Sequence, residues 1–172
     1  EYGGFWSAVE KSWVKLERIQ LVAACNPSTD AGRSILSARF TRHTSIVYVG
    51  YPQEQSLRQI YSTFSKAVMK EVGLIDLCDQ LSNAMIEVYM KAKAEFTQDI
   101  ECHYIFSPRE LTRWIKGIHH ALNNYTTVKL QDVKLVWLHE GLRLFRDRLV
   151  SSKHSDRMDD ILYDTSNKYF ND

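Results

Sequence analysis

The sequence predicts a mainly α-helical protein with a small β part at its N-terminal end. From Gln55 onward, apolar residues recur at three- and four-residue steps, which is the period of a helix that buries one face. Before that point, short apolar runs rich in β-branched residues alternate with polar, turn-forming segments, which is typical of strands. The period changes near residues 50–53 (GYPQ), which predicts a boundary between residues 1–52 and residues 53–172.

Three strand signals define the β part. Residues 5–6 and 13–16 flank a mostly polar stretch, and this pattern predicts a β-hairpin. Residues 19–25 (IQLVAAC) and 45–51 (SIVYVGY) are short apolar runs that end next to prolines, so they predict strands buried on both faces. Between these runs, residues 27–32 are turn-rich and residues 34–41 predict one or two helical turns.

The second part contains successive helical patterns. Apolar residues recur with helical spacing over residues 57–68, 81–92 and 111–122, and a broken run over residues 74–79 predicts a helix start. A longer pattern over residues 133–149 is apolar on more than one face, which predicts the central and most buried helix. A weaker pattern over residues 156–170 predicts the last helix.

Composition and charge exclude several function classes. The 172 residues include 22 Lys and Arg against 21 Asp and Glu, and this near balance argues against a large nucleic-acid footprint. No apolar run approaches the roughly 20 residues of a membrane span. Cys25, Cys78 and Cys102 form no C-x-x-C pair, so we expect no disulfide scaffold and a reducing compartment. The pair His119-His120 has no ligand at metal-site spacing, so no metal site is predicted.

The strongest local signal lies in HYIFSPRELTRWIKGIHH, which begins at residue 103. Ser107 and Glu110 have the spacing of a capping box, and Pro108 stands at the favoured first position of a helix. Arg109 falls in the first turn, although that end of a helix already carries partial positive charge. Arg113 follows one turn later on the same side.

Two interpretations of these arginines are open. A solvated basic stripe is the simpler one, because charged residues usually lie at the surface. The sharper one is an anion site, in which free backbone N–H groups, the helix dipole and a guanidinium group all face phosphate.

Three further polar residues follow or precede the predicted strands. Asn26 comes directly after residues 19–25, and ligands of open α/β sheets bind beyond the carboxyl ends of strands. Its amide there would orient a water or hold a phosphate oxygen, although a turn-forming Asn before a proline is the simpler interpretation. Arg39 and Arg42 precede residues 45–51 and would present a guanidinium group at a surface or simply be solvated. No G-x-x-x-x-G-K-[ST] loop and no Ser-His-Asp signature stands out.

The order of these features resembles an AAA+ P-loop ATPase. In that family, sensor 1 is an Asn at the end of a buried strand, and the arginine finger lies on the segment that follows it. The last core strand comes next, and sensor 2 is an arginine at a helix start in the small helical lid. The resemblance implies that residues 1–52 are the C-terminal portion of the large α/β subdomain. Residues 53–172 would then be the small α-helical lid subdomain.

Particular stretches resemble the cytoplasmic dynein heavy chains, and among their modules the third AAA+ module. These stretches are WVKLERIQ (13–20), ACNP (24–27), TD (29–30), GR (32–33), RF and RH (39–43), QIY (59–61), HYIFSPRELTRW (103–114) and LFRDRLV (144–150). The resemblance covers nearly the whole sequence. It departs from the family pattern at Ser28 and Ala31, where proline is usual, and this bears on the stiffness of the loop after sensor 1.

The resemblance implies a role for each candidate site residue. Asn26 would be sensor 1, and Arg109 would be sensor 2 with Arg113 as a secondary nucleotide contact. Arg42 would be an arginine finger that acts on the nucleotide of the neighbouring module, with Arg39 as its rival. The intact module would bind ATP or ADP with Mg.

The resemblance also implies a setting. The parent would be a minus-end-directed microtubule motor of the cytoplasm and cytoskeleton, in which two heavy chains form a homodimer and the AAA+ modules of each chain are neighbours. The sequence would begin after the Walker A and Walker B segments, so we expect it alone to be inactive and to bind no cofactor tightly. Residues 19–25 and 45–51 would lack their usual sheet partner, so we expect the first fifty residues to be rearranged or paired with a second copy.

Two alternatives stay open from the sequence. One is a fragment of another AAA+ machine of the clamp loader or replication initiator type, in which a basic helix contacts DNA phosphates; the near-neutral charge argues against it. The other is a helical protein-interaction module without a nucleotide role, in which Arg109 and Arg113 bind the acidic face of a partner. Neither a nucleic acid nor a membrane is an expected partner of the favoured interpretation.

Overall fold

The computed structural model describes residues 3–26 and 34–170. The chain divides into two units, Glu1–Val49 and Gly50–Asp172. The division falls next to residues 50–53, where the period of the sequence changes.

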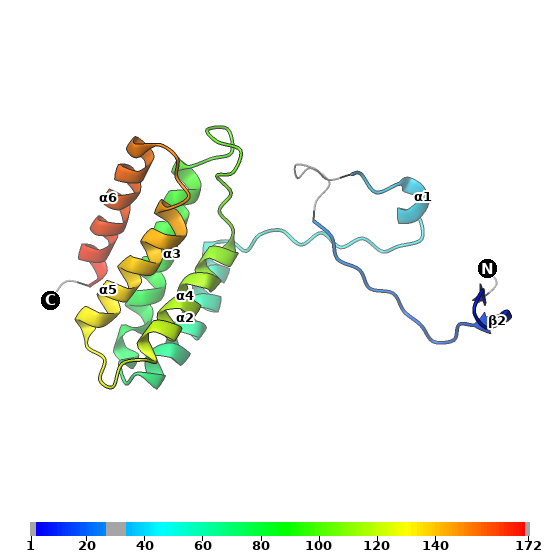
Figure 1. Ribbon diagram of the computed structural model, residues 1–172, viewed down its shortest axis with the longest axis horizontal. Helices are drawn as coiled ribbons and strands as arrows, with labels where there is room; N and C mark the ends of the chain where they lie inside the picture. The colour runs from blue at the N-terminus through cyan, green and yellow to red at the C-terminus, as the bar shows by residue number, and fades with distance from the viewer. Residues whose placement is uncertain (1–2, 27–33, 171–172) are drawn as a thin grey trace. The chain divides into compact units, whose positions relative to one another are not determined.

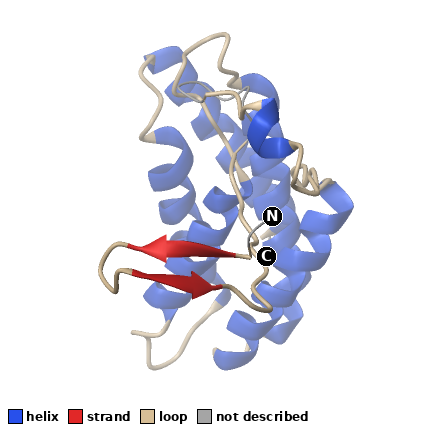
Figure 2. Ribbon diagram, turned by 90° about the vertical axis from the view of Figure 1, so that its right-hand side faces the viewer, coloured by secondary structure: helices blue, strands red, loops and turns tan. Residues whose placement is uncertain are grey.

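The first unit contains a β-hairpin, whose strands are drawn in red in Figure 2. Strand β1 (Gly4–Ser7) pairs antiparallel with β2 (Ser12–Lys15), and this register places Trp6 opposite Trp13. Aromatic cross-strand pairs of this kind stabilise hairpins. The turn closes with Lys11 in the left-handed region, at φ 49°. The predicted hairpin is confirmed.

The predicted strands at residues 19–25 and 45–51 do not form. Both segments are unpaired, and their apolar side chains face solvent; Leu21 is 92% exposed and Val22 is 90% exposed. A strand needs a neighbour for its backbone hydrogen bonds, and the hairpin is the only sheet within the described residues. The apolar pattern alone therefore does not make a strand.

Between these two segments lies the short helix α1 (Ala38–Thr41), which confirms the helical turn predicted for residues 34–41. Ser37 caps it, because its side-chain oxygen accepts a hydrogen bond from the Phe40 N–H at 3.3 Å. The turn-rich segment 27–32, with Ser28 and Ala31, lies outside the described residues.

The second unit is a bundle of helices (Figure 1). Its elements are α2 (Glu54–Glu71), the 3₁₀ turn η1 (Ile75–Leu77), α3 (Cys78–Glu95), α4 (Pro108–Leu122), α5 (Leu130–Gly141), the π-helical segment η2 (Leu142–Arg146) and α6 (Ser152–Tyr169). Helix α3 packs against α2, α4 and α6, and α5 packs against α4 and α6. The helical segments predicted from the sequence are confirmed. No helix in the described parts of the chain is both long and apolar enough for a membrane crossing.

A glycine ends α2 and reverses the chain toward η1. Gly73 has a φ of +76°, a conformation that other residues rarely adopt. Its N–H donates to the Lys70 carbonyl at 3.3 Å, and the next N–H, of Leu74, donates to the Met69 carbonyl at 2.9 Å. These two bonds form a Schellman motif, which satisfies carbonyl groups at the helix end.

The bundle core is aromatic around Trp114 on α4. Its indole N–H donates to the Trp137 carbonyl at 3.0 Å, and its ring centroid lies 4.9 Å from that of Trp137 and 5.3 Å from that of Phe145. Gly141 makes room for this packing, because a Cβ there would lie 2.7 Å from Trp114 and 2.8 Å from Leu162.

Residues 133–149, predicted to form one long and most buried helix, are as buried as α3 but do not form a single α-helix. Helix α3 has eight buried residues, and residues 133–149 also have eight: five in α5, two in η2 and Leu149. Because α3 has neighbours on three sides, its buried positions extend around the helix, and small residues such as Ala84 and Ala92 allow close packing. The pattern over residues 133–149 is instead divided between α5 and the π-helical segment η2.

Candidate functional site

Helix α4 begins with the predicted capping box. The Glu110 carboxylate accepts hydrogen bonds from the Ser107 backbone N–H at 2.8 Å and from the Ser107 hydroxyl at 3.0 Å. The Arg109 N–H donates to Ser107 Oγ at 3.3 Å, and the Glu110 N–H donates to the Ser107 carbonyl at 3.1 Å. Pro108 has no N–H. The cap therefore uses the backbone donors of the first turn.

This geometry corrects one part of the anion-site hypothesis. The backbone N–H groups of residues 109 and 110 are bonded to Ser107, so they are not free to face phosphate. The Glu110 side chain, which is only 5% exposed, already places a negative charge at the positive end of the helix. What is left for an external anion is the pair of arginine side chains.

Arg109 and Arg113 lie one turn apart on α4, and both are exposed. Within residues 3–26 and 34–170, neither guanidinium group makes a hydrogen bond or an ion pair. The structure thus brings two free positive charges together at the start of α4. Exposure alone fits the solvated stripe as well as the anion site.

Helix α2 holds the start of α4 on one side. The Tyr61 hydroxyl donates to the Pro108 carbonyl at 2.6 Å and lies 2.8 Å from the Thr112 hydroxyl. Burial raises the pKa of Tyr61. Burial and the negative charge of Glu110 raise the pKa of Tyr89, on α3, to about 12. Both phenols are therefore neutral at physiological pH, and the Tyr61 hydroxyl keeps the proton that it donates.

The loop after η2 holds the same region through Arg148. One nitrogen of its guanidinium group donates to the Ile105 carbonyl at 2.8 Å, and another lies 3.5 Å from Glu110 Oε1. The group also lies over the Phe106 ring, 5.0 Å from its centroid. Sequence reasoning missed Arg148, because Arg148 and Ile105 are 43 residues apart and only the packed bundle brings them together.

The other candidate residues belong to the first unit. Asn26 is exposed and lies in an unpaired extended segment. Arg39 lies in α1 and Arg42 is its C-cap residue, so the structure brings these two together on one short element. The Arg42 Nε donates to His43 Nε2 at 2.7 Å, and neither arginine makes an ion pair with any described residue.

Histidine and carboxylate groups form no metal centre in the part of the chain that the structure describes. His119 instead joins α4 to α2, with its Nε2 2.6 Å from Glu71 Oε2.

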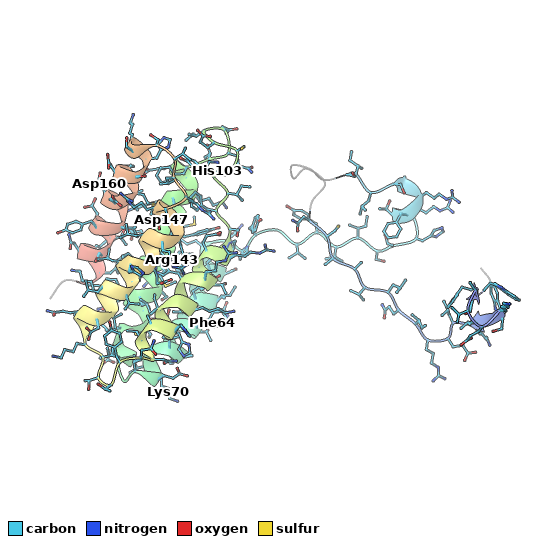
Figure 3. All side chains as sticks on the ribbon, viewed as in Figure 1. Phe64, Lys70, His103, Arg143, Asp147 and Asp160 are labelled. Atoms are coloured by element: carbon cyan, nitrogen blue, oxygen red, sulfur yellow. The ribbon has the colours of Figure 1, made fainter. Side chains whose placement is uncertain are left out.

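A groove of about 820 Å³ lies between α5–η2 and α6, where Figure 3 labels Arg143, Asp147 and Asp160. Arg143 is paired with Glu140 at 2.6 Å. None of the residues that line this groove belongs to the start of α4.

Comparison with known proteins identifies the class of the second unit. Residues 60–155 match the family model described as "Dynein heavy chain, ATPase lid domain". The matched region runs from α2 into α6 and includes the whole start of α4. The second unit is therefore an ATPase lid domain, and the chain belongs to the dynein heavy chain family.

Individual relatives agree with this assignment. The chain is 46% identical over 171 residues to the cytoplasmic dynein heavy chain of Caenorhabditis elegans, a match that covers 99% of this chain and 4% of the relative. It is 50% identical over 151 residues to that of Drosophila melanogaster, which covers 87% of this chain and 3% of the relative. The chain thus spans about 4% of the length of these relatives. The resemblance to dynein heavy chains is confirmed, and the clamp loader or initiator alternative is set aside.

Proposed function

We propose that this chain is part of the ATP-binding ring of a cytoplasmic dynein heavy chain, at the third AAA+ module, and that Arg109 is its sensor 2 arginine. One observation carries the proposal. Arg109 projects, exposed and without a partner among the described residues, from a helix start that Tyr61 holds on one side and Arg148 on the other.

The fixed helix start gives Arg109 a mechanical role. A guanidinium group binds phosphate oxygens through two parallel hydrogen bonds. Because the backbone beneath Arg109 is bonded to α2 and to the loop after η2, a nucleotide that binds this side chain acts on the whole lid. The lid would therefore change its angle with the nucleotide state. Arg113, one turn further along, would be a secondary contact.

The residues present fit the phosphate part of a nucleotide but supply no magnesium site. The two free guanidinium groups of Arg109 and Arg113 favour an anion. No cluster of carboxylates with metal-site geometry occurs in the described residues. Bound ATP with Mg would bring the transferable phosphoryl group, and this chain would contribute positioning charges. We expect the chain alone to be inactive.

Asn26, Arg39 and Arg42, which belong to the first unit, would have separate roles. Asn26 would be sensor 1 and place the attacking water or contact the γ-phosphate. Arg42 would be the arginine finger for the preceding module, with Arg39 as the rival. Their support is the order of these residues in the sequence and their exposure in the first unit. Residues 1–52 would then complete the large α/β subdomain, and residues 53–172 would be its lid.

The wider setting is also a proposal. The relatives are named cytoplasmic dynein heavy chains, which supports a part of a cytoplasmic motor chain. By the resemblance alone, the parent would be a cytoskeletal motor that moves toward microtubule minus ends as a homodimer. The immediate partners of this chain would be the neighbouring AAA+ modules. We propose no nucleic-acid or membrane partner.

The test compares arginine variants of the full-length heavy chain. Arg109→Ala should weaken the affinity of this module for ATP and ADP by about tenfold or more, the range of a lost charge-assisted hydrogen bond. Arg113→Ala should have a smaller effect, and Lys116→Ala, which removes an exposed charge further along α4, is the matched control.

Affinity is measured by equilibrium titration with a fluorescent nucleotide. If Arg113→Ala abolishes binding and Arg109→Ala does not, the two roles are exchanged. If both variants bind nucleotide like the control, these arginines form a solvated stripe or serve a protein partner, and the proposal is wrong.

A further inference from the structure

We propose that Arg148 is a positioning residue that fixes the start of α4 and so sets the direction of Arg109. This inference rests on the proposed function of Arg109. Arg148 itself would not touch nucleotide, because its guanidinium group is already engaged by Ile105, Phe106 and Glu110.

The segment before α4 is fastened to the loop after η2 at several points. The Val150 N–H donates to the Tyr104 hydroxyl at 3.1 Å, and the same hydroxyl lies 3.1 Å from His154 Nδ1. His103, labelled in the loop between α3 and α4 in Figure 3, places its Nε2 3.2 Å from the Arg148 carbonyl. The backbone and the side chain of Arg148 therefore hold the same segment.

The Glu110 carboxylate connects Arg148 to the cap. Its Oε1 faces Arg148, while its Oε2 accepts both hydrogen bonds from Ser107. Arg148 is the only cationic side chain within ion-pair distance of Glu110 in the described residues, and the nearby Tyr61 and Tyr89 are neutral. A buried carboxylate that loses its counter-charge is strongly destabilised. Reorientation of Glu110 toward water would open the capping box.

Arg109 depends directly on that box. Its own N–H is bonded to Ser107 Oγ, and the next residue is Glu110, so an open cap would leave the first turn of α4 loose beneath the Arg109 side chain. At the other end of the connection, Arg146 in η2 is paired with Asp159 on α6 at 2.9 Å. Arg148 thus links the direction of Arg109 to the α6 side of the lid.

A double-mutant cycle in the full-length heavy chain tests this inference. The variants are Arg148→Ala, Arg109→Ala and the double variant, and the readout is nucleotide affinity of this module. Arg148→Ala should weaken affinity by about tenfold, within the usual range of coupling between sites. In the Arg109→Ala background it should add less than about twofold, because a residue that acts through Arg109 has nothing left to position.

Two further variants separate positioning from general stability. Arg157→Ala removes another arginine–carboxylate pair of the lid, with Glu95 at 2.7 Å between α6 and α3, and should leave nucleotide affinity unchanged. Arg148→Lys keeps the positive charge near Glu110 and should recover most of the affinity. If Arg148→Ala does not fold, Arg148→Gln, which also removes the positive charge, takes its place in the cycle.

Hydrogen exchange on the 172-residue chain reads the local effect. The amides of Arg109 and Glu110 should exchange at least about tenfold faster in Arg148→Ala, as local opening becomes easier, but not in Arg157→Ala. If Arg109→Ala leaves affinity unchanged, the proposed function fails whatever Arg148 does. If Arg109→Ala weakens binding while Arg148→Ala has no effect, or adds fully in the double variant, the inference about Arg148 is overturned and the function stands.

Discussion

Glu87 should stabilise the bundle at neutral pH and lose this contribution in acid. Its carboxylate accepts hydrogen bonds from Lys168 Nζ at 2.7 Å and from the Tyr169 hydroxyl at 2.9 Å, both on α6, and Lys91 Nζ lies 2.9 Å away. Burial acts to raise the pKa of Glu87, but these partners together outweigh burial and lower the pKa from 4.5 to about 2. The carboxylate thus joins α3 to the end of α6.

The magnitude follows from the linkage between protonation and folding. The fall in the pKa of Glu87 from 4.5 to about 2, at about 1.36 kcal/mol for each pH unit, corresponds to at most about 3–4 kcal/mol. Lys91 and Lys168 are 41% and 58% exposed, so solvent screens both pairs. We therefore expect Glu87→Gln to lower the free energy of unfolding by about 1–2 kcal/mol at pH 7. Because the folded pKa is lowered, the contribution is complete above pH 4.5 and disappears as the pH falls toward about 2.

Urea unfolding of the 172-residue chain and its Glu87→Gln variant, at a series of pH values, measures this difference. Glu101→Gln is the matched control, because Glu101 makes no ion pair with any described residue. The reasoning is refuted if the two chains are equally stable at pH 7, or if their difference is as large near pH 2 as at pH 7.

Three further outcomes are expected. Gly141→Ala should lower the free energy of unfolding by roughly 1–3 kcal/mol, because its Cβ would meet the buried Trp114 ring; an unchanged urea midpoint contradicts this. In the full-length heavy chain, Asn26→Ala should slow hydrolysis more than it weakens ATP binding, and lost affinity with normal turnover per bound ATP would rule out sensor 1. Arg42→Ala should change nucleotide turnover in the preceding module while its own module binds nucleotide normally, as measured by nucleotide occupancy module by module. If Arg39→Ala has that effect and Arg42→Ala does not, Arg39 is the arginine finger; a defect confined to the module's own pocket rules out both.

Local signals predicted the helices well. Ser107, Pro108 and Glu110 define the first turn of α4 within four residues, and the structure forms the capping box that they predict. The same signal also implied that the first-turn N–H groups are used by the cap. The anion-site hypothesis did not take this into account, although the sequence alone was enough to show that these N–H groups are not free.

Local sequence patterns could not predict features that depend on contacts between segments far apart in the chain. The runs at residues 19–25 and 45–51 have the composition of buried strands, but a strand forms only beside another strand. Arg148 has no distinguishing neighbour in sequence, and its contacts with Ile105 and Glu110 exist only because the loop after η2 packs against the start of α4. The burial of helix α3, which equals that of residues 133–149, was underestimated because sequence patterns show apolar faces and do not show how many neighbours cover them.

The central claim is that Arg109 contacts the nucleotide of its own module, and a structure of the full-length heavy chain with an ATP analogue bound in this module tests it most directly. The distance to measure joins the Arg109 guanidinium group to the nearest phosphate oxygen. We predict about 2.7–2.9 Å, the length of a charge-assisted hydrogen bond, with the Ser107–Glu110 cap intact beneath it. A phosphate group bound by other residues, with Arg109 in solvent or on the acidic face of a neighbouring module, would contradict the account.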